Sequence, residues 1–139
     1  MRGPIYRFRS EERGDLAAYI AAGLLLPFII YLLFTTISLM QLGYQTFIVH
    51  QILVAGIQRD SIDGGLTPSL EESLTSQLQA AGFSSSSIRI RGTPNPVAYG
   101  QWLFLTVHVT TPFSLPGLHT NTVTLGGELQ STSNLPPVS

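Results

Sequence analysis

The chain of 139 residues has room for one small folded domain and an anchoring segment, but not for two independent cores. A net charge of −1 argues against nucleic-acid binding, which normally needs a basic face, and the absence of cysteine excludes disulfides and thiolate metal sites. Only 11% of the residues are charged, against about 25% in soluble domains, and residues 16–58 contain no Asp, Glu, Lys or Arg.

Residues 1–14 form a short arginine-rich segment ahead of this uncharged stretch. Four of the seven arginines precede Asp15, whereas the other end of the stretch meets Arg59 together with Asp60 and Asp63. Positive charge marks the cytoplasmic side of a membrane-spanning segment. We therefore expect residues 1–14 to be a cytoplasmic leader and the C-terminal two-thirds of the chain to lie outside the membrane.

Residues 16–40 consist mostly of Leu, Ile, Ala and Phe. As a helix these 25 residues span about 38 Å, enough to cross a hydrocarbon core of about 30 Å. The apolar region of a signal peptide normally covers only about 7–15 residues and closes on a small-x-small cleavage site, which is missing here. The segment is therefore predicted to be a transmembrane helix that contacts membrane lipid.

The helical pattern continues beyond the apolar segment, so one helix is expected over residues 15–58. Apolar positions recur at helical spacing between Ile48 and Ile57, which predicts an amphipathic second half that packs on the outer domain. Pro27 lies inside the span. It is either an ordinary membrane proline or a point where the helix kinks or locally melts, and the sequence favours neither.

Small residues cluster near the start of the predicted helix and would let helices approach closely in lipid. The expected helix-packing residues are Ala17, Ala18, Ala21, Ala22 and Pro27.

Residues 59–131 are expected to form an extracytoplasmic α+β domain. Thr67 can cap a short helix that begins at Pro68 and ends at Gly82. Its apolar stripe would consist of Leu70, Leu74, Leu78 and Ala81.

About three antiparallel strands should follow this helix. Ile88 and Ile90 alternate with two arginines, residues 101–110 alternate strongly, and residues 120–130 alternate around a Gly126–Gly127 pair that suggests a bulge. Residues 132–139 read as a disordered tail. The predicted fold class is therefore α+β, a long N-terminal transmembrane helix that extends into this small domain.

Several apolar side chains are candidates for an interaction surface. Trp102 and Phe104 stand opposite the apolar face of their strand and need cover from the long helix or a neighbouring subunit. Phe113, Leu115 and Leu118 follow in a loop, where they either project or fold under the sheet.

Residue patterns typical of catalysis are missing from the sequence. The three histidines, His50, His108 and His119, are scattered without metal-ligand spacing, and the sequence contains neither a glycine-rich phosphate loop nor a nucleophile elbow. We therefore expect no enzyme activity, no cofactor and no metal.

At residues 13–27, "RGDLAAYIAAGLLLP", the chain resembles TadE-like pseudopilins and related type IV pilin-like proteins of bacterial Tad-type pili and conjugative elements. The resemblance extends to the arginine-rich leader, the apolar helix and the "AGIQRDSIDGG" that follows it. It implies a structural subunit that assembles with other pilin-like subunits or with copies of itself. It also implies that a prepilin peptidase cuts between Gly14 and Asp15, although the glutamate usual at the fifth mature position is replaced by Tyr19.

Two hypotheses follow. The first is a pilin-like subunit of a pilus, secretion or conjugation apparatus that assembles through its apolar helix. The second is an unprocessed single-span accessory protein that recruits partners to a secretion complex. A membrane-anchored module that binds an extracellular ligand comes third.

Overall fold

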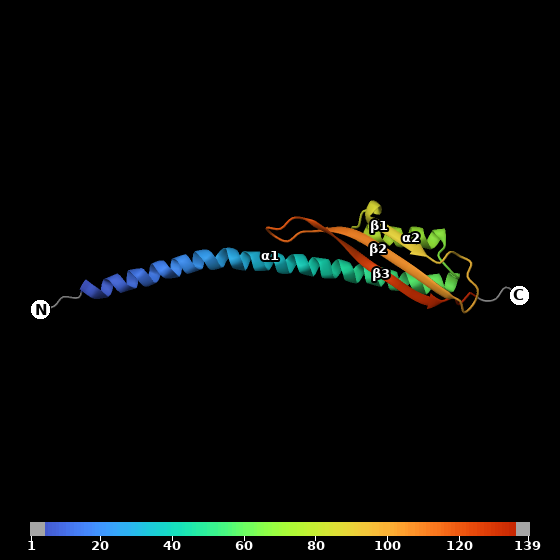
Figure 1. The fold of residues 1–139 in the computed structure, drawn as a ribbon, viewed down its shortest axis with the longest axis horizontal. Coiled ribbons are helices and arrows are strands. Elements are labelled where there is room, and N and C mark those ends of the chain that lie inside the picture. The colour runs from blue at the N-terminus through green and yellow to red at the C-terminus, as the bar shows by residue number, and fades with distance from the viewer. Residues whose placement is uncertain (1–4, 136–139) are drawn as a thin grey trace.

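The computed structural model describes residues 5–135, with the side chains placed from Gly14 onward. The fold is α+β, as predicted: a long apolar helix, a short helix and a three-stranded antiparallel sheet. The elements in chain order are α1 (Ile5–Asp63), α2 (Pro68–Ala80), the 3-10 turn η1 (Ser85–Ser87), β1 (Ile88–Gly92), β2 (Trp102–Phe113) and β3 (Asn121–Thr132). Figure 1 shows the small domain lying along the C-terminal half of α1 while the N-terminal half extends alone.

Helix α1 continues to Asp63, five residues beyond the predicted end at Gln58. The helix stops where Gly64 and Gly65 adopt φ angles of 72° and 125°, a region that favours glycine. The helix is continuous through Pro27, and Figure 1 shows a gentle bow rather than a break. The first four residues of the predicted leader lie outside the described residues.

One stripe of α1 packs against the small domain. The stripe begins at Thr35 and recurs every three or four residues, which keeps it on one face of the helix. Its less exposed members are Thr35, Ser38, Leu42, Gln45, Val49, Leu53, Gly56 and Asp60. The amphipathic second half predicted from the sequence therefore exists, but it starts at Thr35, inside the predicted transmembrane segment 16–40, rather than beyond that segment.

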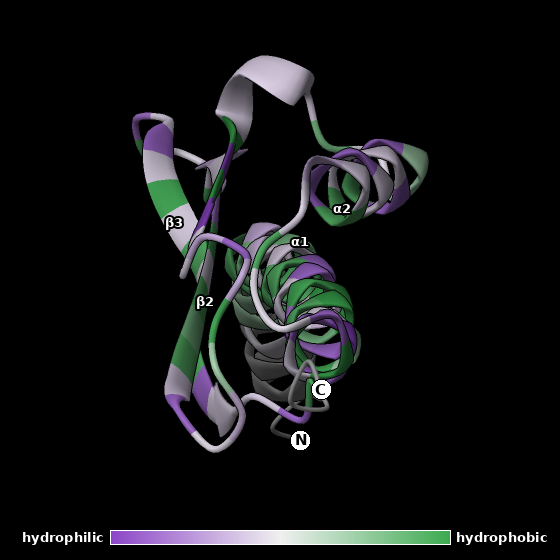
Figure 2. Cartoon of the chain, turned by 90° about the vertical axis from the view of Figure 1, so that its right-hand side faces the viewer, coloured by the Kyte–Doolittle hydropathy of each residue, from purple (hydrophilic) through white to green (hydrophobic). Residues whose placement is uncertain are grey.

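The hydrophobic core lies between α1, α2 and one face of the sheet. Figure 2 shows both helices on the same side of the strands. Leu53 of α1 and Leu74 of α2 are 2% and 1% exposed, and Leu105 of β2 is fully buried. The other core residues are Val49, Ile57, Leu70, Leu78, Phe83, Val107, Val109 and Leu125. The two helices and the sheet thus share one core at one end of a long helix.

Helix α2 forms as its sequence predicts at its start and differs at its end. The Thr67 hydroxyl accepts a 3.3 Å hydrogen bond from the Leu70 amide, and Pro68 occupies the first turn. Ala81, predicted to extend the apolar stripe, is exposed. Gly82, at φ 98°, turns the chain so that Phe83 is buried in its place.

The strands are longer than predicted, and β2 pairs with β3 over its whole length, from Trp102↔Thr132 to Phe113↔Asn121. The predicted bulge at Gly126–Gly127 is wrong, because both glycines pair one to one with His108 and Val107. Gly126 instead allows close approach of the two strands. An added Cβ at this position would lie 1.9 Å from the carbonyl oxygen of Val107.

The predicted disordered tail begins too early. Thr132 ends β3, and Ser133 is 1% exposed, with its hydroxyl donating to the Val97 carbonyl at 3.0 Å. The amide of Asn134 donates to the Ser61 carbonyl at 2.7 Å. The first bond ties the chain after β3 to the loop between β1 and β2, and the second ties it to the last turn of α1. Residues 136–139 lie outside the described residues.

Candidate functional site

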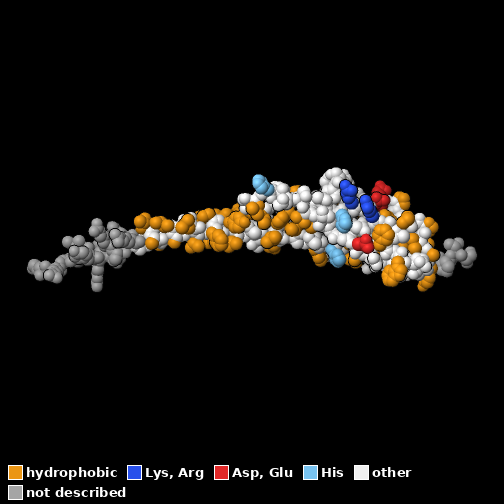
Figure 3. All heavy atoms as spheres, in the orientation of Figure 1, with side chains coloured by type: hydrophobic (Ala, Val, Ile, Leu, Met, Phe, Trp, Pro, Cys, Tyr) orange, Lys and Arg blue, Asp and Glu red, His pale blue; other side chains and the backbone are white. Residues whose placement is uncertain are grey.

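The first candidate surface is the free part of α1, Gly14–Phe34, which is exposed at every position. Its 21 residues span about 31 Å, close to the hydrocarbon thickness of a bilayer. It is part of the one helix that, within the described residues, is long and apolar enough to cross a membrane. Figure 3 shows hydrophobic side chains along this segment.

All the predicted helix-packing residues lie on this free segment. Ala17, Ala18, Ala21, Ala22 and Pro27 are exposed, so the fold leaves them open to lipid or to another helix. The predicted processing position, Gly14–Asp15, lies within helical backbone that begins at Ile5.

Two hydroxyl groups near the end of the free segment are bonded within α1, whereas the buried hydroxyl of Thr35 has no partner among the described residues. Thr36 donates to the Leu32 carbonyl at 2.8 Å, and Ser38 donates to the Phe34 carbonyl at 2.9 Å. A hydroxyl bonded in this way can enter an apolar environment at low cost. These polar residues are therefore compatible with a position at the membrane boundary.

The predicted interaction surface separates into two places. Trp102 and Phe104, 71% and 40% exposed, lie at the start of β2. Phe113 and Leu115 are half-buried, and Leu118 is 62% exposed, at or beyond the end of the same strand. Eleven residue steps at about 3.3 Å put the two groups about 36 Å apart. They cannot form one continuous surface.

The outward face of the sheet forms a shallow hollow of mixed polar and apolar lining beside Phe104. Arg89 and Arg91 of β1 lie opposite His108 and Thr106 of β2, and the Thr106 hydroxyl contacts the Glu128 carboxylate at 3.3 Å. Figure 3 shows basic, acidic and histidine side chains gathered on this domain. Mixed charge of this kind suits a solvated face.

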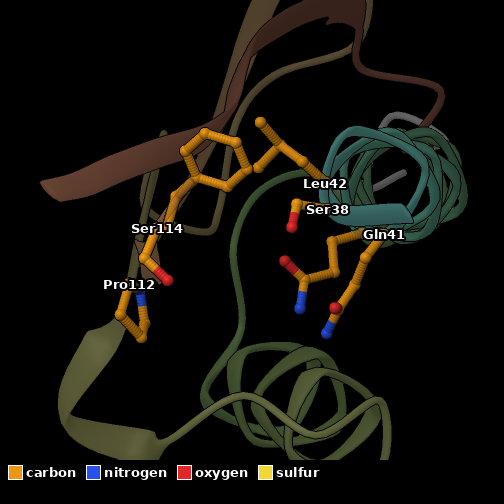
Figure 4. A pocket seen from close by; sticks show the side chains of 7 residues that line it. Ser38, Gln41, Leu42, Pro112 and Ser114 are labelled. Atoms are coloured by element: carbon orange, nitrogen blue, oxygen red, sulfur yellow. The ribbon is translucent and has the colours of Figure 1, made fainter. Parts of the chain in front are cut away.

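A second hollow separates α1 from the hairpin formed by β2 and β3. It is a cleft of about 150 Å³. Figure 4 shows Ser38, Gln41 and Leu42 on the helix side and Pro112 and Ser114 on the hairpin side. The sequence analysis missed this contact. Its signal was the polar residues at helical spacing within an apolar stretch, which indicate contact with protein rather than with lipid.

Asp60 is a buried acid that the sequence analysis did not identify. It is 0% exposed, and neither carboxylate oxygen has a hydrogen-bond partner among the described residues. Burial, and to a lesser extent the nearby Asp63 carboxylate, raises the pKa of Asp60 from 3.8 to about 6. The charged form of Asp60 therefore destabilises the folded domain at neutral pH.

We expect the stability of the outer domain to fall as the pH rises from about 4 to about 6. The folded state holds the Asp60 proton more tightly than the unfolded state, so the favourable contribution is complete below the unfolded pKa and is lost as the pH passes the folded pKa. The shift corresponds to about 3 kcal/mol. The free energy of unfolding of Asp60→Asn, measured at several pH values, should not show this decrease between about pH 4 and pH 6. Asp63→Asn, an exposed control, should largely retain it.

The described residues contain no group of three or more His, Asp or Glu side chains that could hold a metal ion. His50, His108 and His119 are exposed on α1, on β2 and in the hairpin loop, and the structure does not bring them together. Comparisons with protein-family models, with characterised proteins and with solved structures found no match for this chain.

Proposed function

We propose that this chain is a single-span membrane protein of the pilin-like class, a structural subunit that assembles through its apolar helix. In this arrangement residues 1–14 lie in the cytoplasm and the α+β domain lies outside the membrane. The partners are lipid and other pilin-like subunits or copies of the same chain.

The observation that carries the proposal is the division of α1 into two parts. From Thr35 onward one face is covered by the chain's own domain, whereas Gly14–Phe34, apolar except for Asp15 near its start, is exposed around its whole circumference. A helix that is apolar on all sides requires lipid or other helices around it. Exchange of lipid for neighbouring helices keeps the apolar surface away from water, so the same segment suits both the bilayer and the core of a filament.

The small residues supply the proposed contact between subunits. Replacing both Ala18 and Ala22 by leucine should block assembly and leave membrane insertion intact, because the added side chains separate the helices without reducing hydrophobicity. Cross-linking between subunits and membrane fractionation measure the two properties.

Gly23→Leu is the matched control for this pair. It adds the same kind of bulk about 100° around the helix from Ala22, where a Cβ would meet no atom within 4 Å. Assembly of Gly23→Leu but not of the double variant is the expected result. Normal assembly of the double variant would remove the packing role of this face.

The second candidate function, an unprocessed accessory protein, is favoured by two observations. The backbone is helical through Gly14, and a peptidase needs an extended substrate, so α1 would have to unwind there before cleavage. Tyr19 also occupies the position where the pilin-like class usually carries glutamate.

The mass of the mature N-terminus, measured with and without the prepilin peptidase of the host, distinguishes the two functions. A subunit processed as the resemblance implies begins at Asp15. Intact Met1 in purified surface fibres would contradict cleavage at Gly14, and intact Met1 in a membrane complex without fibres would favour the accessory protein.

A further inference from the structure

We propose that the tip of the β2–β3 hairpin, residues 112–120, rests in the headgroup region of the lipid bilayer and gives the outer domain a second membrane contact. The proposal rests on the proposed membrane span of α1. The partner of the hairpin tip is a lipid surface, and the residues that contact the lipid are the apolar side chains of the tip.

The hairpin points back along α1 toward the free segment. Figure 1 shows it reaching past β1 and α2, beside the middle of the long helix. The residues that line the cleft show where the hairpin lies along α1. On the hairpin these are Pro112, Phe113 and Ser114, which face Ser38, Gln41 and Leu42 of α1. The free segment ends at Phe34, one helical turn before Ser38. A bilayer around Gly14–Phe34 therefore has its outer boundary beside the hairpin tip.

The chemistry of the tip suits that boundary. The sequence has no Asp, Glu, Lys or Arg between Arg91 and Glu128, so His119 is the one ionisable side chain in the tip. The tip contributes the apolar residues Pro112, Phe113, Leu115, Pro116 and Leu118. Leu118 is 62% exposed, Pro112 is exposed, and Phe113 and Leu115 are only half-buried, so the exposed apolar surface of the tip is not confined to one leucine. Apolar groups beside polar loop atoms are typical of segments that lie at the headgroup level.

The cleft explains how the tip is kept at this depth. Ser38, Gln41 and Gln45 present polar groups to the hairpin, so the helix does not bury the tip in the core of the domain. The two strands behind it pair continuously over 12 residues each, which makes the hairpin a stiff arm. Two contacts on one membrane, the helix and the arm, fix both the tilt and the rotation of the outer domain.

Single-cysteine labelling tests the proposal, because the natural chain has no cysteine. An environment-sensitive fluorophore is attached at Leu118→Cys, at Phe28→Cys in the free segment, and at Tyr99→Cys. Phe28 and Tyr99 are 57% and 64% exposed, so all three sites accept a label. Tyr99 lies just before Trp102, at the end of β2 remote from the tip. Each full-length variant is reconstituted in phosphatidylcholine vesicles whose acyl chains carry bromine either near the headgroup or near the chain end.

The expected result is a blue-shifted Leu118 probe that shallow bromine quenches more than deep bromine. The Phe28 probe should show the reverse order, and the Tyr99 probe should remain unquenched. Quenching at Phe28 with none at Leu118 would overturn the hairpin contact and leave the membrane span standing. Loss of quenching at both positions would overturn the span as well. A Leu118 probe that is blue-shifted yet unquenched would place a second copy of the chain on the tip and would also overturn the proposal.

Discussion

A leucine in place of Gly56 is expected to destabilise the outer domain strongly while the free part of α1 stays helical. Gly56 lies where α1 crosses both β2 and α2: an added Cβ would lie 2.8 Å from Leu105 Cδ2 and 3.0 Å from Leu74 Cδ2. Small shifts of those two side chains could admit a methyl group, but a leucine needs space that the core does not have. Overpacking should cost about 3 kcal/mol, a large share of the roughly 5–10 kcal/mol that stabilises a small domain.

Gly43→Leu is the matched control, because a Cβ at this position on the same helix meets no atom within 4 Å. Leucine is also the better helix former by roughly 1 kcal/mol, so this variant should be at least as stable as the natural chain. Amide hydrogen exchange in detergent micelles measures the outcome. The amides of α2 and β2 should lose protection in Gly56→Leu only. Unchanged protection there would show that the layers can separate at Gly56 without loss of the domain.

The sequence predicted the elements well because most of them carry one apolar stripe. Leu70, Leu74 and Leu78 recur at helical spacing, whereas apolar residues between 103 and 109 occupy every second position. The spacing of the buried residues therefore distinguishes the helix from the strand. These stripes depend on local periodicity alone. For that reason the α+β fold, the cap at Thr67 and the alternation in β1 were all predicted correctly.

Element ends were predicted less well because distant contacts determine them. The last turn of α1 is held by the chain beyond it: the Gly65 amide donates to the Asp60 carbonyl, and the Asn134 amide donates to the Ser61 carbonyl. No sequence pattern near residue 60 predicts a hydrogen bond with residue 134. The end of β2 was missed because Pro112 suggests a loop. Since β1 pairs only as far as Val109, Pro112 lies where β2 has one neighbouring strand, and a proline is tolerated there.

The observed end of β2 also locates the candidate interaction residues of the hairpin. The sequence left open whether the loop after residue 110 projects or folds under the sheet. The strand in fact continues to Phe113, so Phe113 and Leu118 lie at or beyond the end opposite Trp102. Strand length therefore decides which apolar residues lie near the free helix and which lie far from it. Asp60 could not be recognised at all, because its burial depends on neighbours from other parts of the chain.

The fold places the two exposed apolar features on the same side of the domain. The domain's own core is complete without the free segment of α1 and without the hairpin tip. Both features remain apolar although neither contributes to that core, which supports the proposed contacts outside the chain. A membrane boundary between Phe34 and Ser38 would satisfy both at once.

Replacing Gly126 by alanine should separate the hairpin from the rest of the sheet. The new Cβ would lie 1.9 Å from the Val107 carbonyl oxygen, so backbone rather than a flexible side chain would have to move. The φ angle of 111° is also strained for alanine. We expect a loss of about 3 kcal/mol or more in the free energy of unfolding in detergent micelles. Gly127→Ala is the adjacent control: a Cβ there meets nothing within 4 Å, so stability should change by less than about 1 kcal/mol.

The same variant links stability to the proposed membrane contact. Gly126 pairs with His108, and the paired residues from this point to Asn121 and Phe113 form the arm that carries the tip. If strain at Gly126 releases the arm, a fluorophore at Leu118 should lose its blue shift in vesicles, while one at Phe28 keeps its own. Gly127→Ala should leave both probes unchanged. A Leu118 probe that stays at the headgroup level in a destabilised Gly126→Ala would show that the tip binds lipid by its own hydrophobicity and does not need a stiff arm to hold it there.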